Sequence, residues 1–180
     1  MAGIREVSTS EFTKIYSLEH PPVIRSLEII TGLNFDDGII PKGTIVGKIT
    51  ATGAFRPLTV TALSGTVTAA TTIYVDDPEI FKATDVLTIS TSTTTVVSVN
   101  TTTQALVVTP AISGADDATV SCDDGAQTDY AITVMDVDTE SAADGVPCLV
   151  HGIAYTDYVW NKQTTSEANL IGKIWFIDAI

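Results

Sequence analysis

The segment that most constrains the fold is residues 59–121, which contain seventeen threonines and one basic residue, Lys82. β-Branched residues favour the extended backbone and pack well on a pleated surface. The short runs "TIYV", "DVLTIS", "TTVVSVN", "ALVVTP" and "ATVSC" are separated by turn residues. Alternation predicts that Val97 and Val99, and then Leu106 and Val108, lie on buried faces, with a hairpin turn at residues 100–103. These patterns predict an all-β fold.

The flanking segments also read as strands and turns. We expect strands at "VIRSLEII", at Thr44–Thr50, at "DYAITVMDVDT", at "VPCLVHGIAYTDYVW" and at "IWFIDAI", the last as a central strand. "NFDDG" predicts a turn that needs a positive φ at Gly38. Short helical turns are expected at "DDPEIFKATD", with Asp77 as N-cap, at "SAADG" and at "TTSEANLIGK".

The composition therefore predicts three parts. Residues 1–22 form a polar N-terminal arm. Residues 23–58 and 122–180 form one discontinuous β domain, and residues 59–121 form a Thr-rich β subdomain inserted into a surface loop. An insertion of this size is tolerated because the cost of closing a loop grows slowly with its length.

Charge excludes several partners. The chain has 22 acidic and 9 basic residues and a formal net charge of −13. Nucleic acids and anionic membranes attract cationic surfaces, so we expect neither as a partner. The acidity provides solubility or faces a basic partner surface. The chain has no apolar run of the ~20 residues that a membrane span needs and no secretory leader, so we expect it to fold in a cytoplasm.

The acidic residues raise the question of chemistry. Asp136 and Asp138 are two apart on a predicted strand and therefore share a face, which makes them a candidate pair for a divalent cation, with Asp144 as a third carboxylate. The alternative is that the strand ends here and the acids face water. No sequence motif of a hydrolase, nucleotide-binding enzyme or metalloprotease is present. We therefore expect no enzyme, no cofactor and no metal.

The positions of the histidines and cysteines also favour a protein without a catalytic or metal site. His151 follows an apolar run, which is typical of a structural histidine, and His20 precedes a proline in the arm. Cys122 and Cys148 are far apart and lack the spacing of a zinc site. They are either two inert thiols or a disulfide, and a reducing compartment favours the thiols.

Several segments together resemble the lambda-type phage head decoration proteins. "DGAQTDYAITVMDVDT" resembles the family's Asp-Gly turn and following strand, and "VPCLVHGIAYTDYVW" resembles the next strand with its aromatic bend. "IIPKGTIVGKIT" and "LIGKIWFIDAI" resemble the family's early and final strands. The resemblance covers about residues 23–58 and 122–180, and the insertion departs from the compact members.

The resemblance implies a small β-barrel-like domain without activity or cofactor. It implies a homotrimer on the outer surface of the expanded virion capsid, at local three-fold positions, where it stabilises the head against internal DNA pressure. Its partners would be the major capsid protein and itself. The N-terminal arm would add a strand to the capsid protein through the anchors Ile4, Arg5, Val7, Phe12, Lys14, Ile15 and Tyr16.

Two further questions stay open at this point. Aromatic residues are enriched in interfaces, so Tyr155, Tyr158, Val159 and Trp160 are candidates for the trimer interface, or else they cover the core of their own subunit. The alternative function is a β-rich adhesin on a virion surface that binds glycans or a host surface. The insertion contributes only Tyr74 and Phe81 as aromatic residues for such a site.

Overall fold

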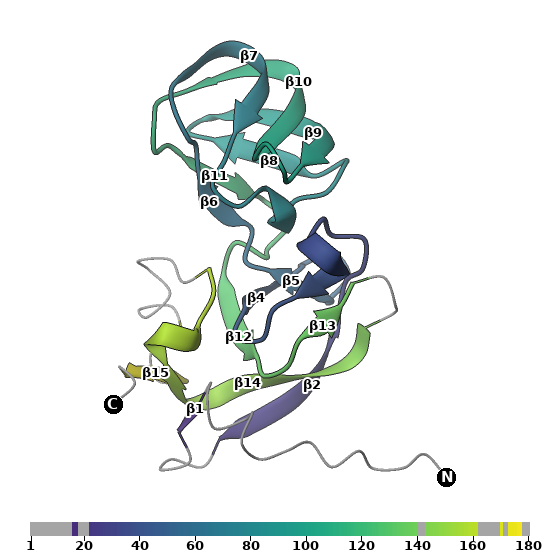
Figure 1. The fold of residues 1–180 in the computed structure, drawn as a ribbon, viewed down its shortest axis with the longest axis vertical. Helices are drawn as coiled ribbons and strands as arrows, with labels where there is room; N and C mark the ends of the chain where they lie inside the picture. The colour runs from purple at the N-terminus through teal and green to yellow at the C-terminus, as the bar shows by residue number, and fades with distance from the viewer. Residues whose placement is uncertain (1–15, 18–21, 140–142, 162–169, 171–172, 178–180) are drawn as a thin grey trace.

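The chain is an all-β protein, as predicted, and its strands form two stacked lobes (Figure 1). The computed structural model describes residues 16–17, 22–139, 143–161, 170 and 173–177. Within these residues, short 3-10 turns at Asp36–Gly38 (η1), Pro78–Ile80 (η2) and Thr156–Tyr158 (η3) interrupt the strands. No helix in the described part of the chain is long and apolar enough to cross a membrane.

The strands divide between the lobes by their position in the sequence. The lower lobe in Figure 1 takes its strands from both flanks of the chain: β1 (Tyr16–Ser17), β2 (Val23–Ile29), β3 (Ile39–Ile40), β4 (Ile45–Lys48), β5 (Phe55–Pro57), β12 (Asp129–Thr133), β13 (Val137–Asp138), β14 (Ala143–Tyr155) and β15 (Ile174–Ile177). The upper lobe takes the strands between them: β6 (Val60–Ala62), β7 (Val67–Tyr74), β8 (Val86–Ile89), β9 (Ser92–Asn100), β10 (Ala105–Gly114) and β11 (Thr119–Cys122).

The lower lobe is a small closed barrel. Its strands follow the order β14-β12-β4-β5-β2, and β2 pairs with β14 to complete the circuit. Strands β4 and β12 bury both faces, because Ile45 and Ile132 belong to one apolar cluster while Val46 and Ala131 belong to another. A strand that is buried on both faces reads as a continuous apolar run, which explains why "TIVG" and "YAITV" show no clean alternation.

Strand β14 extends beyond the barrel and organises its lower end. Its last residues pair with β1 on one side, at Tyr16↔Ala154, and with β15 in parallel on the other side, from Gly152↔Ile174 onward. The prediction that "IWFIDAI" forms a central strand is wrong. Within the described residues β15 pairs with β14 alone, and Trp175 and Ile177 are exposed.

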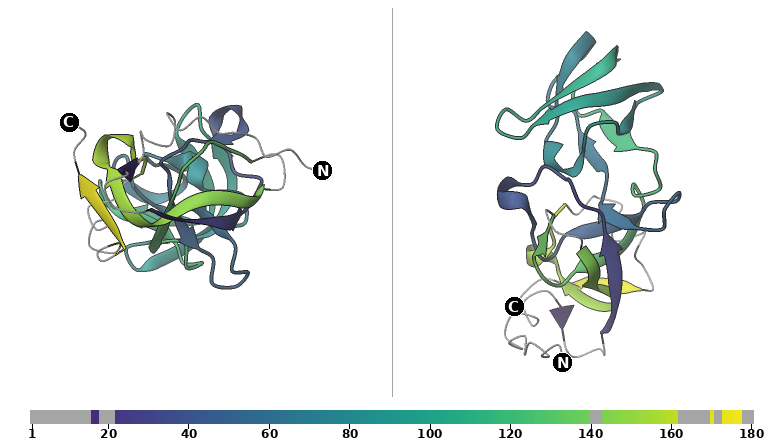
Figure 2. Two further views of the ribbon diagram at one scale, coloured as in Figure 1. Left: turned by 90° about the horizontal axis from the view of Figure 1, so that it is seen from below. Right: turned by 90° about the vertical axis from the view of Figure 1, so that its right-hand side faces the viewer.

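The upper lobe is a curved sheet in the order β6-β11-β8-β9-β10-β7. An isolated bridge between Leu63 and Val75 brings the first and last strands of this order together. The Asn100–Thr103 turn forms as expected, and the Asn100 side chain accepts a hydrogen bond from the Thr103 N–H at 3.0 Å. Figure 2 (right) shows this sheet stacked on the barrel along the long axis.

The predicted inward position of Val97 is wrong. The pairing of β10 with β9 steps from Val107↔Ser98 to Val108↔Val96, so that Val97 is the extra residue of a β-bulge. A bulge reverses the alternation that a regular strand would keep. Val96 is therefore buried, whereas Val97 is 51% exposed.

Two other local predictions need correction. The helical turn expected in "SAADG" does not form at residues 143–145, because these residues belong to β14, and residues 140–142 lie outside the described part. Asp77 precedes η2, but its side chain makes no cap hydrogen bond and instead accepts one from the Thr61 hydroxyl. Burial and the charge of Asp76 raise the pKa of Asp77, while the Thr61 hydrogen bond lowers it. The helix predicted at residues 164–173 falls largely outside the described residues.

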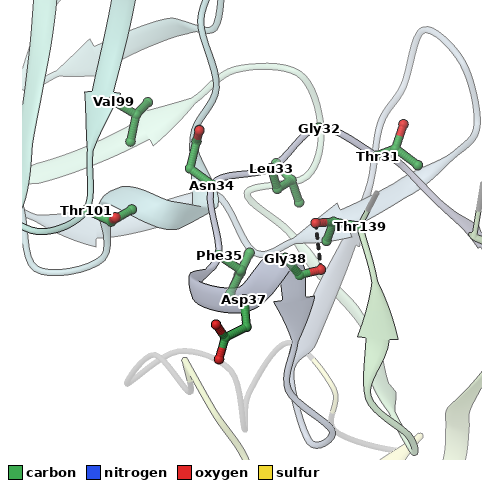
Figure 3. Close-up of a pocket in the computed structure, with 10 residues that line it drawn as sticks. All are labelled: Thr31, Gly32, Leu33, Asn34, Phe35, Asp37, Gly38, Val99, Thr101 and Thr139. Carbon is green, nitrogen blue, oxygen red and sulfur yellow. Dashed lines mark hydrogen bonds between the residues drawn. The ribbon is translucent and has the colours of Figure 1, made fainter. Parts of the chain in front are cut away.

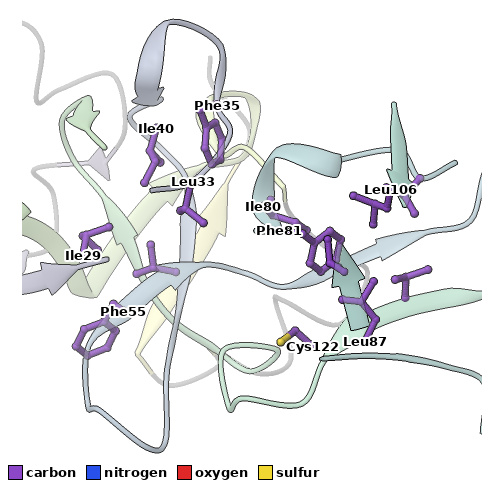
Figure 4. Close-up of a cluster of buried hydrophobic side chains, with 14 of the residues drawn as sticks. Ile29, Leu33, Phe35, Ile40, Phe55, Ile80, Phe81, Leu87, Leu106 and Cys122 are labelled. Atoms are coloured by element: carbon purple, nitrogen blue, oxygen red, sulfur yellow. The ribbon is translucent and has the colours of Figure 1, made fainter. Parts of the chain in front are cut away.

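One apolar cluster runs through both lobes (Figure 4). It includes Ile29 and Phe55 of the barrel and Leu87 and Leu106 of the upper sheet. Between them lie side chains from the connecting segments, among them Phe81, which is fully buried. The segment 59–121 is therefore packed on the barrel rather than tethered to it.

A buried arginine joins the lobes at the same place. Arg56 of β5 is 1% exposed, and its two terminal nitrogens contact the two carboxylate oxygens of Asp85 at 3.1 and 2.7 Å. The guanidinium also contacts Asp124 at 3.2 Å and donates to the Ile80 carbonyl. Burial alone would lower the pKa of Arg56, but the hydrogen bond and charge of Asp85, with Asp124, raise it above its ordinary value. The Arg56 guanidinium therefore stays charged throughout the physiological pH range.

We predict that Arg56→Met lowers the free energy of unfolding by about 3–5 kcal/mol, because it leaves the Asp85 carboxylate buried without its cation. Chemical denaturation followed by circular dichroism measures the effect. Lys48→Met is the matched control, since Lys48 is an exposed base on the neighbouring strand β4, and it should change stability by less than about 0.5 kcal/mol. Adding Asp85→Asn to Arg56→Met should recover part of the loss, and strictly additive effects of the two substitutions would contradict this assignment.

Candidate interaction surfaces

Two of the three carboxylates considered for a cation site, Asp136 and Asp138, have described side chains. The Asp136 carboxylate accepts a hydrogen bond from the Lys42 N–H at 2.7 Å, and it is exposed in the loop before β13. Asp138 is exposed on β13, and the side chain of Asp144 lies outside the described part. Among the described residues, no group of three or more His, Cys, Asp or Glu side chains could hold a metal ion. Asp136 instead pins the turn between β3 and β4.

His151 has a packing partner at the end of the barrel. Its ring meets that of Trp175 edge to face, with centroids 5.4 Å apart. A shallow groove here is lined by Val23, Arg25, Tyr130, Val150, His151 and Lys173. The ammonium group of Lys173 lies 5.7 Å from the Tyr130 ring centroid, within the range of a cation–π contact. His20 lies outside the described residues.

The residues predicted for the trimer interface divide into two pairs. Val159 packs against the second apolar cluster, and Trp160 packs against the first, with its ring 5.5 Å from that of Phe35. Both therefore help to cover the core of their own subunit. Tyr155 and Tyr158 contact each other edge to face at 6.5 Å, and Tyr158 is 46% exposed. Of the four, Tyr158 is the side chain that is most available to a partner.

A glycine fixes this aromatic segment to the barrel. Gly43 has a φ of +86°, and a Cβ added there would collide with the Tyr158 carbonyl oxygen. Its carbonyl accepts a hydrogen bond from the Trp160 N–H at 3.0 Å, and its N–H donates to the Thr133 carbonyl at 2.8 Å. Gly43 therefore serves both the tight turn and the close approach of the two backbones.

Of the seven residues predicted as arm anchors, the structure describes Tyr16 alone. Its backbone pairs with Ala154 of β14 within the same chain. One edge of the Tyr16 backbone is therefore used within the subunit, and the role of Tyr16 as a capsid anchor stays a prediction. Ile4, Arg5, Val7, Phe12, Lys14 and Ile15 lie outside the described residues.

Two neighbouring grooves lie at the junction of the lobes. The first is shown in Figure 3 and is bordered by the loop 31–38 of the barrel and by Val99 and Thr101 of the upper lobe. The Thr139 hydroxyl donates to the Gly38 carbonyl at its wall. The second groove has Trp160 at its side and carries the carboxylates of Asp76 and Glu79 and the amide of Gln104.

The cysteines are unreactive by position. Cys122 and Cys148 are both buried and free, so no disulfide joins them. Burial raises the pKa of each thiol to about 12, and for Cys122 the charges of Asp124 and Asp85 add to the effect. The thiol is protonated at physiological pH, whereas the nucleophile is the thiolate.

The sequence interpretation missed the ion pair of Arg56 with Asp85 and Asp124. The available signal was a lone arginine in the apolar run "AFRPL", since a buried arginine requires carboxylate partners. Its two partners are separated from it by 29 and 68 residues, so no local pattern could identify them.

Comparison of the chain with protein-family models, with curated proteins and with solved structures gives no significant match in any of the three.

We predict that Gly43→Ala is more destabilising than Gly65→Ala. Both glycines have a positive φ, but a Cβ at Gly65 would meet open space. The change at Gly65 should cost about 1–2 kcal/mol for the left-handed backbone, and Gly43→Ala should cost about a further 1–3 kcal/mol for displacing the Tyr158 backbone. Thermal and chemical denaturation of both variants measure the difference, and equal losses would contradict the role given to this contact.

We predict that both native cysteines resist thiol reagents while the protein is folded. Since a thiol with a pKa of about 12 stays protonated at pH 7–9, a colorimetric thiol reagent should react slowly in buffer and with two equivalents in denaturant. Rapid modification of the native protein at pH 8 would contradict the burial of these side chains.

Proposed function

We propose that this chain is a structural decoration protein of a tailed-phage head. In this proposal it binds the outer surface of the expanded capsid as a trimer at local three-fold positions, after synthesis in the host cytoplasm. The observation that carries the proposal is the division of the molecule into two ends. A compact barrel holds β1 at one end, and the upper sheet projects from the other end (Figure 1).

The lower end suits a docking role. Strand β1 belongs to the N-terminal arm of residues 1–22 and runs along β14, so the arm is anchored to the barrel at that point. Exposed apolar side chains gather on the strands nearby, including Val23 and Ile24 of β2 and Trp175 of β15. An arm that adds a strand to a partner gains backbone hydrogen bonds without a large interface of its own.

The physical purpose of such a protein is to bind the intact shell in preference to the broken one. A ligand with this preference stabilises the intact shell by mass action. Three linked arms would raise the avidity by about 10²–10⁴-fold if all engage together. A chain with a net charge of −13 would also be repelled by the packaged DNA and would stay on the outside.

We expect the purified chain to bind expanded shells of its phage saturably and to leave unexpanded shells unbound. Phe12→Asp should weaken that binding about tenfold or more, because it places a charge at an apolar anchor. Ser10→Asp is the matched control, since it adds the same charge to the same arm, and it should bind nearly as the wild type does. Co-sedimentation over a concentration series measures both affinities.

Failure to bind expanded shells at any concentration would overturn the proposal. So would shells that lose their DNA at the same temperature with and without saturating protein. Equal weakening by Phe12→Asp and Ser10→Asp would leave the shell binding but remove the anchor role of Phe12.

The groove beside Trp160 favours one alternative, a glycan-binding module. An indole next to the carboxylates of Asp76 and Glu79 and the amide of Gln104 offers both a stacking face and hydrogen-bonding groups for a sugar. A glycan array with the full chain, repeated with Asp76→Asn, tests this alternative. A specific signal that the substitution abolishes would support it over capsid binding.

A further inference from the structure

We propose that the outer face of the upper sheet is a contact surface between copies of this chain. The inference rests on the proposed function, because it names the surface through which copies of the chain would contact one another in the proposed trimer. It places that contact away from the aromatic residues at 155–160 around η3. The surface is a stripe of four exposed apolar side chains, one on each of four adjacent strands: Tyr74 of β7, Val107 of β10, Val97 of β9 and Val86 of β8.

The four side chains point away from the core. Each lies beside a fully or almost fully buried residue of its own strand, namely Ile73, Leu106, Val96 and Leu87. Because successive side chains of a strand point to opposite faces, the neighbours of core residues face outward. Their exposed fractions of 49%, 39%, 51% and 50% agree with that direction. The bulge in β9 is what adds Val97 to this face.

Strand register makes the stripe continuous. Tyr74 pairs with Ala105, which lies two residues before Val107 on β10. Val107 pairs with Ser98, the residue after Val97. On the next strand, Val86 pairs with Thr95, two residues before Val97. The four side chains therefore cross the sheet from β7 to β8 without an intervening strand.

The sheet that carries the stripe is free of charge in a strongly acidic protein. None of its strands, β6 to β11, contains a charged residue. The acids of the insertion lie outside these strands, at residues 76–79, at the buried Asp85 and in the turn at residues 116–117. Two copies that each carry a charge of −13 repel one another wherever their acids meet. A second copy is therefore best accommodated over the part of the stripe on β7, β10 and β9. At the β8 end, the Asp123 carboxylate accepts a hydrogen bond from the Thr88 hydroxyl and borders a groove together with Val86.

The other occupants fit this surface less well. Sugars stack on aromatic platforms, and the stripe offers Tyr74 alone. A basic partner would meet no carboxylate on the strands themselves, and the carboxylate of Asp123 lies at the β8 end of the stripe. By contrast, a Thr/Val surface suits the same surface of other copies gathered about a three-fold axis, since hydroxyl groups both donate and accept hydrogen bonds.

The position of the stripe leaves the proposed docking end free. The upper sheet and strands β1 and β15 lie at opposite ends of the molecule (Figure 1). Copies could thus contact one another through the upper sheets while the barrels remain available to a shell. At η3, by contrast, Val159 and Trp160 already cover the core of their own subunit.

Sedimentation velocity of the full chain tests the contact. We expect a concentration-dependent assembly that strengthens between about 0.05 and 0.5 M salt, since salt screens the repulsion between acidic copies. The double variant Val97→Glu/Val107→Glu should raise the dissociation constant at least about tenfold. Thr102→Glu, at the exposed turn between β9 and β10, and Tyr158→Glu should each leave it within about twofold. Circular dichroism verifies that each variant is folded.

Site-specific cross-linking gives a readout that does not depend on weakening the assembly. Val97→Cys adds an accessible thiol, while the native Cys122 and Cys148 are buried. We expect a short bismaleimide to join two chains of Val97→Cys but not two chains of Thr102→Cys. A chain that stays monomeric at every concentration, an assembly that Tyr158→Glu disrupts and Val97→Glu/Val107→Glu does not, or equal cross-linking of the two cysteine variants would overturn the inference.

The experiments distinguish a failure of the proposed decoration role from a failure of the proposed contact between copies. If the wild type assembles through the stripe but never binds expanded shells, the contact stands and the decoration role falls. If the wild type binds shells while Val97→Glu/Val107→Glu assembles normally, the decoration role stands and the contact falls.

Discussion

The structure depends on a buried cation at the point where its two lobes meet. Arg56 reaches from the barrel to Asp85 of the upper lobe and to Asp124 of the segment that returns to the barrel. A buried charge is strongly unfavourable without such partners. The two-oxygen contact with Asp85 also fixes the direction of both side chains. The position of the upper sheet on the barrel is therefore set by geometry as well as by apolar packing.

Apolar packing completes the junction. Phe81 and Ile80, in and just after η2, are fully buried in the cluster that also contains Phe55 of the barrel. Because this cluster is shared, the two lobes lose apolar contacts if they separate. An inserted subdomain on a flexible tether would need to bury its own core independently. Here the insertion and the barrel supply parts of one core, which holds the projecting sheet in a defined orientation.

Strand β14 has two structural roles: it closes the barrel, and it holds the two strands at the lower end. Its first part closes the barrel by pairing with β2 and β12, and its last part holds β1 and β15. One long strand thus joins the closed core to β1, the described part of the N-terminal arm that pairs with it. At the opposite end, the strands of the upper sheet carry no charged residue, whereas acidic residues lie at 76–79, at 116–117 and at Asp123. The surface proposed for self-contact is therefore separated from most of the acidic residues of this lobe. This separation of ends underlies both proposals.

The sequence by itself determined the class of the fold and most of the individual strands. Runs such as "TIYV", "ALVVTP" and "ATVSC" form strands because β-branched residues are stiff at χ1 and pack well on a pleated, half-buried surface. The turns at Gly38 and at Asn100–Thr103 were also predictable, since glycine conformation and asparagine side-chain hydrogen bonds act locally.

Only the tertiary structure decided which surfaces are exposed and which charges are buried. The outward position of Val97 follows from a bulge against β10, the edge position of β15 follows from its pairing with β14, and the partners of Arg56 come from distant segments. Trp160 packs against the core of its own subunit because the Gly43 turn holds the Trp160 backbone against the barrel. These features depend on strand pairing and long-range packing, whose energies are set by residues far apart in the chain and leave no local pattern.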